Sequence, residues 1–507
     1  MPRPVGLLVE PITHWRAGGG RSACPVRREG RVLSPFLPRA IGQPRDGAHG
    51  PPRAEAGSRY KPDNAAGRTG RSVAAWTTKR LASVRRVGSA VSVNLIWFLA
   101  GPILAIGLLL NGLRAADGRV VLGNEVLAED GFKVLAGKRV GLITNPSGVN
   151  RKLETTLDVL RAAPGVKLVA LFGPEHGIYG DVPAGDKIAS RTDERTGLPV
   201  HSLYGATRKP TAEMLQGLDM LVYDLQDTGC RSYTFVSTMG LSMEACGAAG
   251  VEFVVLDRPN PLGGLRIEGT LVEQEKLRSF VSQWDVPYVY GLTCGELARM
   301  INDRGWIKQA CKLTVVPMRG WRRPMVWADT GLPWVPASPH VPRGDSPLFQ
   351  VATGMIGEIG HVSIGVGYTL PFECIGMPKV NPHALAEKLN GYRLAGVAFR
   401  PLTYKPYYAA YKDEIVGGVQ VYFTDAANAP LTAINYYALE ALKQVAGRDV
   451  LAEALKANKT FDMFDKVNGT DATRLALQAG KSAAEIVAGW KAGEEKFRAA
   501  RQTYLLY

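Results

Sequence analysis

The chain has 507 residues, a formal net charge of +15 and a hydrophobic fraction of 46%. A chain of this length is too long for one typical core, so we expect two domains and an appended segment. Residues 1–116 hold 18 Lys and Arg against 5 Asp and Glu, whereas the remainder holds 43 against 41. The excess charge lies near the N-terminus, which argues against a nucleic-acid partner, because phosphate binding needs a clustered basic face.

The N-terminal segment divides into two parts. Residues 1–92 are rich in Arg, Gly and Pro and show no helical or strand period, so we expect them to be disordered or an untranslated extension. Residues 93–116 contain the apolar run Val93–Leu110, which follows basic residues and precedes small ones. This pattern predicts a signal peptide or, at a marginal spanning length, an uncleaved membrane anchor. Both alternatives imply export to the periplasm or the outside of the cell.

Residues 117–284 alternate between strand and helix signals at the spacing of βαβ units, which predicts a Rossmann-like α/β domain. Continuous apolar strands of this kind form parallel sheets with both faces covered. The predicted strands are 140–144, 167–172, 200–204, 220–225 and 251–256, and the last of these is expected to end the series.

A polar or Gly/Pro-rich loop follows every strand of this series. In open parallel sheets, ligands bind outside the carboxyl ends of the strands. The residues expected to meet at this rim are Asn145, Glu175, His176, Tyr204, Asp224, Asp227, Arg231, Asp257, Arg258 and Asn260.

Residues 285–507 predict a smaller α+β domain, so we expect a cleft between the two domains. Strand candidates are 313–317, 394–400 and 417–424. Helix candidates are 295–304, 384–390, 433–446, 450–457 and 483–499, and a loop rich in Trp and Pro spans 320–344.

The loop Gly173-Pro174-Glu175-His176-Gly177 holds a carboxyl group beside an imidazole. Such a pair suits proton transfer, and a rigid loop at a strand end favours a functional role. The alternative is a pair that only ties the loop down. His176 has no HExxH spacing around it, so we do not interpret it as a zinc ligand.

A second loop, 223–233, holds Asp224, Asp227 and Arg231. Either aspartate could be the second carboxylate that a glycosidase needs opposite Glu175. Arg231 could bind an anionic substituent through both guanidinium nitrogens, or it could form a structural ion pair with Asp227.

The third loop, Asp257-Arg258-Pro259-Asn260-Pro261, has two prolines that restrict its backbone. It would either present Asp257, Arg258 and Asn260 to a ligand or form a plain turn. No nucleotide-binding glycine motif follows a strand, and the five cysteines beyond Cys24 are widely spaced. We therefore predict no metal and no organic cofactor, and we expect most of these cysteines to be buried.

Three tryptophans, Trp321, Trp327 and Trp334, lie in the loop stretch 320–344. Aromatic faces can stack on sugar rings, but clustered tryptophans more often serve packing.

Taken together, several motifs resemble the exo-β-N-acetylmuramidase family over residues 137–507. They are Gly141-Leu142-Ile143-Thr144-Asn145, Gly173-Pro174-Glu175-His176-Gly177, Tyr223-Asp224-Leu225-Gln226-Asp227, Arg231-Ser232-Tyr233-Thr234, Asp257-Arg258-Pro259-Asn260-Pro261 and Tyr504-Leu505-Leu506-Tyr507.

This resemblance implies a two-domain enzyme that releases N-acetylmuramic acid from the non-reducing ends of peptidoglycan fragments, a role in cell-wall turnover. It implies that Glu175 is the catalytic acid and that Arg231 or Arg258 binds the lactyl carboxylate. The same pocket would be lined by His176, Asp224, Asp227, Tyr233, Asp257 and Asn260. The resemblance predicts no oligomeric state.

The chain departs from the family in the stretch 358–373. Glu358 and Glu373 match the family pattern, whereas Ile364, Val366 and Leu370 stand where many members have a carboxylate and two arginines. We expect Glu358 and Glu373 to contact substrate across a less polar wall. Two alternatives follow, namely a hydrolase for a different amino sugar and a non-catalytic periplasmic protein that binds muropeptides or sugars.

Overall fold

The structure is a computed structural model that describes residues 119–457 and 459–507. The predictions for 1–92 and for the signal peptide or anchor at 93–116 lie outside these described residues. Among the described residues, no helix has the length and apolar character needed to cross a bilayer.

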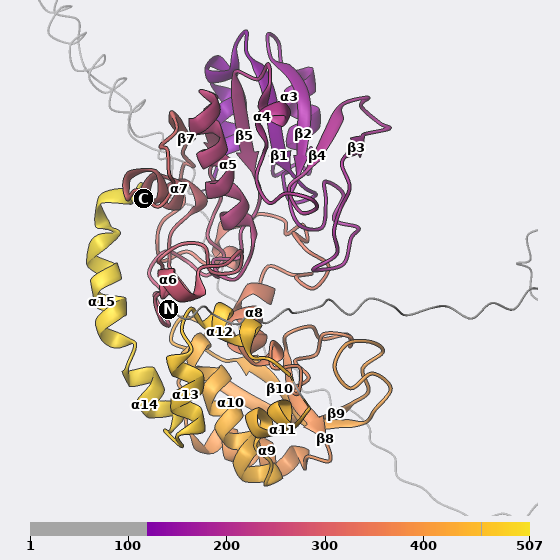
Figure 1. Cartoon of the computed structure of the whole chain (residues 1–507), viewed down its shortest axis with the longest axis vertical. Coiled ribbons are helices and arrows are strands. Elements are labelled where there is room, and N and C mark those ends of the chain that lie inside the picture. The colour runs from indigo at the N-terminus through magenta and orange to yellow at the C-terminus, as the bar shows by residue number, and fades with distance from the viewer. Residues whose placement is uncertain (1–118, 458) are drawn as a thin grey trace, which may run out of the picture. The chain divides into compact units, whose positions relative to one another are not determined.

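The first domain is built on a seven-stranded sheet with the strand order β3-β4-β2-β1-β5-β6-β7 (Figure 1). All neighbouring strands run parallel except β3 and β4. The strands are β1 (Arg139–Thr144), β2 (Lys167–Gly173), β3 (Arg191–Thr192), β4 (Pro199–Ser202), β5 (Met220–Asp224), β6 (Glu252–Leu256) and β7 (Leu313–Val316). The predicted Rossmann-like parallel sheet is therefore confirmed.

Helices cover both faces of this sheet, because successive residues of a strand point to opposite faces. In β5, Leu221 and Tyr223 pack with α5 and α7, whereas Met220 and Val222 pack with α2 and α3. The helices and 3₁₀ turns of this region are α2 (Gly123–Glu129), η1 (Lys133–Leu135), α3 (Thr156–Ala162), α4 (Ala212–Leu215), α5 (Phe235–Ala249), α6 (Gln274–Leu277), α7 (Cys294–Asp303) and η2 (Trp327–Thr330).

One strand lies where the sequence did not place it. The prediction ended the parallel series at β6 and assigned 313–317 to the second half, beyond a boundary at 284/285. Instead, β7 pairs in parallel with β6 and completes the first sheet. A parallel neighbour needs a crossover, and the intervening residues supply it through a long loop and α7.

The second domain has a three-stranded antiparallel sheet with the order β8-β10-β9. Its strands are β8 (Cys374–Pro378), β9 (Val397–Tyr404) and β10 (Val416–Phe423). Its helices are α8 (Ser346–Gly357), α9 (Pro382–Gly391), α10 (Leu431–Ala446), α11 (Val450–Lys456), α12 (Asp462–Asn468), α13 (Ala472–Gln478), α14 (Ala483–Ala488) and α15 (Lys491–Ala500), followed by η3 (Gln502–Tyr504). Helices α8 to α11 form one core with the sheet, as an α+β domain requires.

The sequence analysis did not predict α8, β8, α12 or α13, and it joined α14 and α15 into one helix. Gly489 and Trp490 separate the two, and Trp490 is buried against Tyr436 of α10. After α15 the chain returns to the first domain, where Arg299 of α7 donates to the carbonyl of Tyr504. The C-terminal residues therefore join the two domains.

Candidate active site

A cavity of about 570 Å³ lies between the two domains. This volume is within the usual range for small-ligand sites, about 300–1,000 Å³. The first domain contributes loops after β2 and β4 and the start of α5, and the second contributes α8 and the loops beside β8 and β9. The predicted cleft between domains is confirmed. Its polar lining comprises Glu175, His176, Tyr204, Ser232, Tyr233, Thr234, Tyr288, Ser338, His340, Gln350 and Glu358.

Glu175 stands two residues after β2 and is only 8% exposed. Its Oε2 accepts a hydrogen bond of 2.6 Å from the Thr234 hydroxyl, and its Oε1 accepts one of 3.0 Å from the Gly185 amide. Both carboxylate oxygens are therefore held by donors from separate loops. A carboxylate fixed in this way has the orientation that catalysis at a cavity wall needs.

His176 follows in a left-handed conformation, with φ of 70°. A non-glycine residue in this region is strained, and such residues cluster at functional sites. Its Nδ1 lies 2.8 Å from the carbonyl oxygen of Val182. Because a carbonyl only accepts, Nδ1 carries the proton, and Nε2 is the nitrogen left for other contacts.

Tyr204 follows β4 and lies in the same wall. Burial raises the pKa of its hydroxyl, and the nearby charge of Glu175 raises this pKa further. Tyr204 is therefore a neutral hydroxyl beside the carboxylate. The guanidinium of Arg208 lies over its ring, 3.4 Å from the centroid.

Glu358, at the end of α8, is the second carboxyl group of the cavity. Its side chain has solvent access, yet the surrounding protein removes enough water to raise its pKa. Among the described residues it has neither a hydrogen-bond nor an ion-pair partner. An unpartnered carboxyl group with a raised pKa is suited to carrying a proton.

The part of the second domain's wall formed by residues 362–372 is apolar, as the departures in 358–373 predicted. Ile364 and Val366 line the cavity together with Phe372. Glu373 does not line it, because its carboxylate accepts from Arg343 and from Gln420. Glu373 is therefore not placed to make the expected substrate contact in this cavity.

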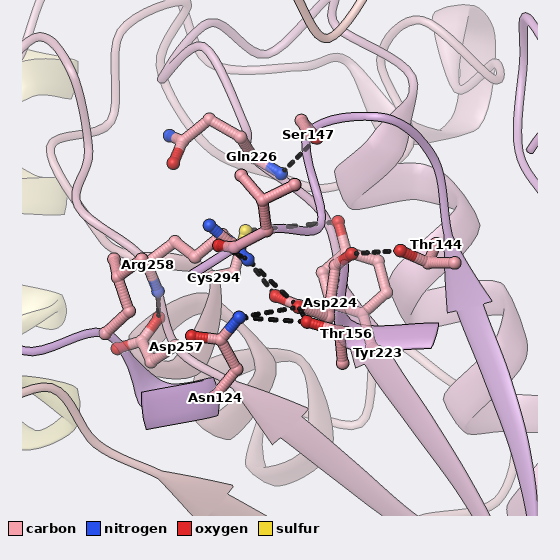
Figure 2. A network of polar contacts seen from close by, with 12 residues as sticks. Asn124, Thr144, Ser147, Thr156, Tyr223, Asp224, Gln226, Asp257, Arg258 and Cys294 are labelled. Carbon is pink, nitrogen blue, oxygen red and sulfur yellow. Dashed lines mark hydrogen bonds and ion pairs between the residues drawn. The ribbon is translucent and has the colours of Figure 1, made fainter. Parts of the chain in front are cut away.

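Asp224 and Arg258 belong to a separate buried network (Figure 2). The guanidinium donates to both oxygens of Asp224, at 2.5 and 2.9 Å, and to the carbonyl of Val149 at 2.8 Å. Thr156 and Asn124 also donate to Asp224. Asp224 is 0% exposed, so the structure does not support its predicted catalytic role.

This network explains why the cavity lies to one side of the sheet. The strand order reverses between β1 and β5, where open sheets usually bind ligands. Here a gap of only about 10 Å³ remains, lined in part by Gln226, Arg258, Leu332, Pro333 and Val335. The cavity instead lies beyond β2 and β4.

The other predicted rim residues are also engaged within the protein. Asp257 accepts from the Gly295 amide and from the hydroxyls of Thr293 and Tyr507, and burial raises its pKa to about 6. Asn260 donates to Leu292, and Asn145 donates to Ala337. These three residues do not line the cavity; they fix loops and, through Tyr507, the C-terminus.

Asp227 and Arg231 do not form the alternative ion pair. Asp227 accepts from Tyr290 and Gly229, and burial raises its pKa to about 6. Arg231 donates to the carbonyls of Thr270, Val286 and Val467, and burial lowers its pKa to about 10. Arg231 is 1% exposed and ties the domains together, so it is not placed to bind a substrate carboxylate.

Of the thirteen predicted site residues, five line the cavity, namely Glu175, His176, Tyr204, Tyr233 and Glu358. The prediction missed His340, Thr234 and Ser338 in the same wall. The Arg231-Ser232-Tyr233-Thr234 motif contained Thr234, but nothing in its local pattern distinguished an orienting hydroxyl. His340 and Ser338 lie in an irregular loop, where no strand end pointed to them.

The tryptophans of 320–344 serve packing. Trp321 and Trp327 are buried, and Trp334 meets Trp327 edge-on at 4.8 Å. All five described cysteines are buried and free, as predicted for most of them. Within the described ranges, no group of three or more His, Cys, Asp or Glu is placed to hold a metal.

The chain joins an α/β domain to an α+β domain, and two carboxyl groups lie in the cavity between them. These features define a two-domain protein with a glycosidase-like site. Family models for exo-β-N-acetylmuramidase NamZ match the chain, the N-terminal model over residues 140–345 and the C-terminal model over 350–507. The chain belongs to the exo-β-N-acetylmuramidase family.

Individual relatives agree with this assignment. The chain is 42% identical over 393 residues to the peptidoglycan β-N-acetylmuramidase NamZ of Bacillus subtilis, covering 78% of this chain and 92% of that protein. A crystal structure of a DUF1343 family protein from Bacteroides fragilis superposes with a TM-score of 0.71 and 47% identity, covering 77% of this chain and 99% of that one. A second protein described in the same way, from the same organism, gives 0.59 and 28%, covering 76% and 99%.

Proposed function

We propose that this protein is an exo-acting glycosidase that releases N-acetylmuramic acid from the non-reducing ends of peptidoglycan fragments. One observation carries the proposal: Glu175 is held by Thr234 and Gly185 in the wall of the cavity between the domains. The 42% identity to a peptidoglycan β-N-acetylmuramidase supports the substrate class.

Glycoside hydrolysis commonly uses two carboxyl groups, one protonated and one ionised. Glu175 and Glu358 are the two carboxyl groups in the cavity lining. Both oxygens of Glu175 accept hydrogen bonds, whereas the surrounding protein removes part of the water around Glu358 and raises its pKa. We assign the ionised role to Glu175 and the proton-donating role to Glu358, which reverses the role that the family resemblance implied for Glu175.

In this scheme, Glu358 protonates the oxygen of the leaving sugar as the glycosidic bond breaks. The carboxylate of Glu175 either activates a water molecule or attacks the anomeric carbon. Tyr204 and His176 lie beside Glu175 and would hydrogen-bond to the sugar or to the water. The apolar wall of Ile364 and Val366 would pack against the sugar ring.

A muramyl substrate also brings a lactyl carboxylate, which needs a cation or hydrogen-bond donors. Arg231 and Arg258 are engaged elsewhere, and the cavity lining contains neither Lys nor Arg. Arg208 lies just behind Tyr204, and its buried Nη1 has no hydrogen-bond partner among the described residues. We assign recognition of the lactyl carboxylate to Arg208.

The direct test is release of N-acetylmuramic acid from a chromogenic muramyl glycoside and from a disaccharide of N-acetylmuramic acid and N-acetylglucosamine. The wild type should hydrolyse both, and Glu175→Gln should lower kcat by at least about 10³-fold on both. Glu387→Gln, the same change at an exposed position on α9, is the matched control. Full activity in Glu175→Gln would refute the proposed role.

The apolar second wall favours one further candidate, a hydrolase for a different amino sugar. Ile364 and Val366 offer no charge to an acidic substituent. A comparison of kcat/KM on muramyl and N-acetylglucosaminyl glycosides decides between the two sugars. Binding without turnover of either glycoside would favour the non-catalytic binding protein.

Export of the protein remains a proposal that rests on the pattern of residues 93–116. Cell fractionation and N-terminal sequencing of the exported form test it. A mature N-terminus near residue 117 supports a cleaved signal peptide, and an intact N-terminus in the membrane fraction supports an anchor.

A further inference from the structure

Two exposed tyrosines lie beside the cavity, on the loop 405–415 between β9 and β10. Tyr407 is 62% exposed and Tyr408 is 49% exposed. The next two residues of the loop, Ala409 and Ala410, line the cavity. Both tyrosines therefore stand on a loop that continues directly into the cavity wall.

The loop is held in one conformation despite its exposure. The Tyr407 amide donates to the carbonyl of Gly367 at 2.6 Å, and the Tyr411 hydroxyl donates to the carbonyl of His361 at 2.8 Å. Gly367 has φ of 89°, and a Cβ there would lie 1.9 Å from the carbonyl oxygen of Tyr408. Only glycine permits this close approach, so the loop is fixed against its neighbour.

Tyr408 is also tied to the opposite domain. Its hydroxyl lies 2.8 Å from Nε2 of His340, and the two rings are nearly parallel, with centroids 6.0 Å apart and an interplanar angle of 28°. His340 itself lines the cavity. The hydroxyl is thus engaged, and the ring of Tyr408 is oriented before any ligand arrives.

We propose that Tyr408 stacks against the sugar on the leaving-group side of the scissile bond. This inference rests on the proposed function and deepens it. The aromatic patch would take the N-acetylglucosamine that follows the terminal N-acetylmuramic acid.

The geometry of exo cleavage indicates which sugar would contact Tyr408. The terminal ring must enter the cavity to reach Glu175, so the rest of the glycan must leave along its rim. The apolar C–H face of a pyranose packs well against an aromatic face. A ring already held by His340 loses little conformational freedom on binding, which favours contact at this position.

The test compares two substrates that differ only in the leaving group. β-N-Acetylmuramyl fluoride releases an ion too small to reach Tyr408, whereas the disaccharide releases a sugar ring. Tyr408→Ala should lower kcat/KM on the disaccharide about tenfold and leave the fluoride within about twofold. Tyr408→Phe should retain most of the activity because the ring remains. Tyr422→Ala, a change at a 44% exposed tyrosine of β10, is the matched control.

If Tyr408→Ala lowered kcat/KM equally on both substrates, Tyr408 would have a structural role and the proposal would be wrong. Unchanged kcat/KM on both substrates would also overturn the proposal. Calorimetric titration of the disaccharide into Glu175→Gln, with and without Tyr408→Ala, measures stacking independently of turnover. About tenfold weaker binding in the double variant supports the stacking, and unchanged binding refutes it. A wild type that turns over neither substrate would instead refute the proposed function.

Discussion

Two clusters of acidic, basic and hydroxyl side chains lie near the carboxyl end of the first sheet, and they differ in how their groups are partnered. Around Asp224, both carboxylate oxygens accept hydrogen bonds, from Arg258, Thr156 and Asn124, and the gap that remains is about 10 Å³. Around Glu175, hydroxyls and imidazoles face a cavity of about 570 Å³. We call them the closed network and the open site.

Residue type and position at a strand end therefore do not by themselves identify a catalytic group. A buried charge must be paired, and a pair that satisfies itself has no capacity left for substrate. The closed network therefore stabilises the junction of β1, β5 and β6. The open site instead keeps a carboxyl group, Glu358, that has no partner within residues 119–457 and 459–507. Variants in the two clusters should separate stability from activity.

The largest effect is expected in the closed network. Asp224→Asn leaves the Arg258 guanidinium buried without its counter-charge, which typically costs about 3–5 kcal/mol of unfolding free energy. Chemical denaturation of wild type and variant measures this loss. The kcat per folded molecule should stay within about twofold of the wild type, because neither residue lines the cavity.

Glu387→Gln on the exposed face of α9 serves as the control for denaturation, and its unfolding free energy should be unchanged. If Asp224→Asn were fully folded and as stable as the wild type but had a lower kcat, Asp224 would have a catalytic role.

The next effect concerns the open site and Glu358. Removal of a general acid costs about 10²–10⁴-fold in rate when the leaving group needs a proton. Glu358→Gln should show this loss on the disaccharide, but much less on a chromogenic glycoside, because a good leaving group departs unprotonated. Glu175→Gln should instead lose activity on both substrates.

The pH dependence follows from the raised pKa of Glu358. The acid is active when protonated, so wild-type turnover of the disaccharide should fall as the pH rises through that raised pKa. In Glu358→Gln this fall should be absent. If the activity of the variant still fell at high pH as in the wild type, another group would be the proton donor.

A third effect returns to the closed network, where burial raises the pKa of Asp257 from 3.8 to about 6. Between these values the folded state binds more protons than the unfolded state, so stability falls as the pH rises. Protonation of Asp257 contributes about 3 kcal/mol to the free energy of unfolding. This contribution is present in full below pH 3.8 and is lost as the pH rises through about 6. Asp257→Asn should remove this part of the pH dependence, measured by urea unfolding at pH 4 to 7.

Much of the fold could be predicted because apolar periodicity is a local signal. The five predicted strands of the first sheet lie within about two residues of β1, β2, β4, β5 and β6. The assignment of β7 to its sheet was not predictable in this way, since pairing with β6 is decided by a crossover over more than fifty residues. Helix α8 was missed because its start follows the irregular Pro- and Trp-rich loop.

The candidate site was predicted less well, for a physical reason. The sequence places side chains at strand ends, but it does not show which of them bond to one another. Arg258 and Asp224 are 34 residues apart, and Arg231 and Val467 are 236 apart. Glu175 was identified because its loop carries its own rigid backbone signal, whereas Thr234, which orients it, was not.

The smallest of these effects concerns Arg208, which lies behind Tyr204 of the open site. Arg208→Met removes the guanidinium charge. It should lower kcat/KM about tenfold to a hundredfold on a muramyl glycoside whose lactyl carboxylate is free, because a charge-assisted hydrogen bond is lost. The same variant should hydrolyse a muramyl glycoside whose carboxylate is masked as an amide at the wild-type rate. A residue that only supports the Tyr204 ring would slow both substrates equally, and Arg208→Lys, which keeps the charge, should recover part of the lost discrimination. Equal slowing would therefore place Arg208 with the supporting structure and leave the histidines of the cavity, His176 and His340, as the groups that meet the carboxylate.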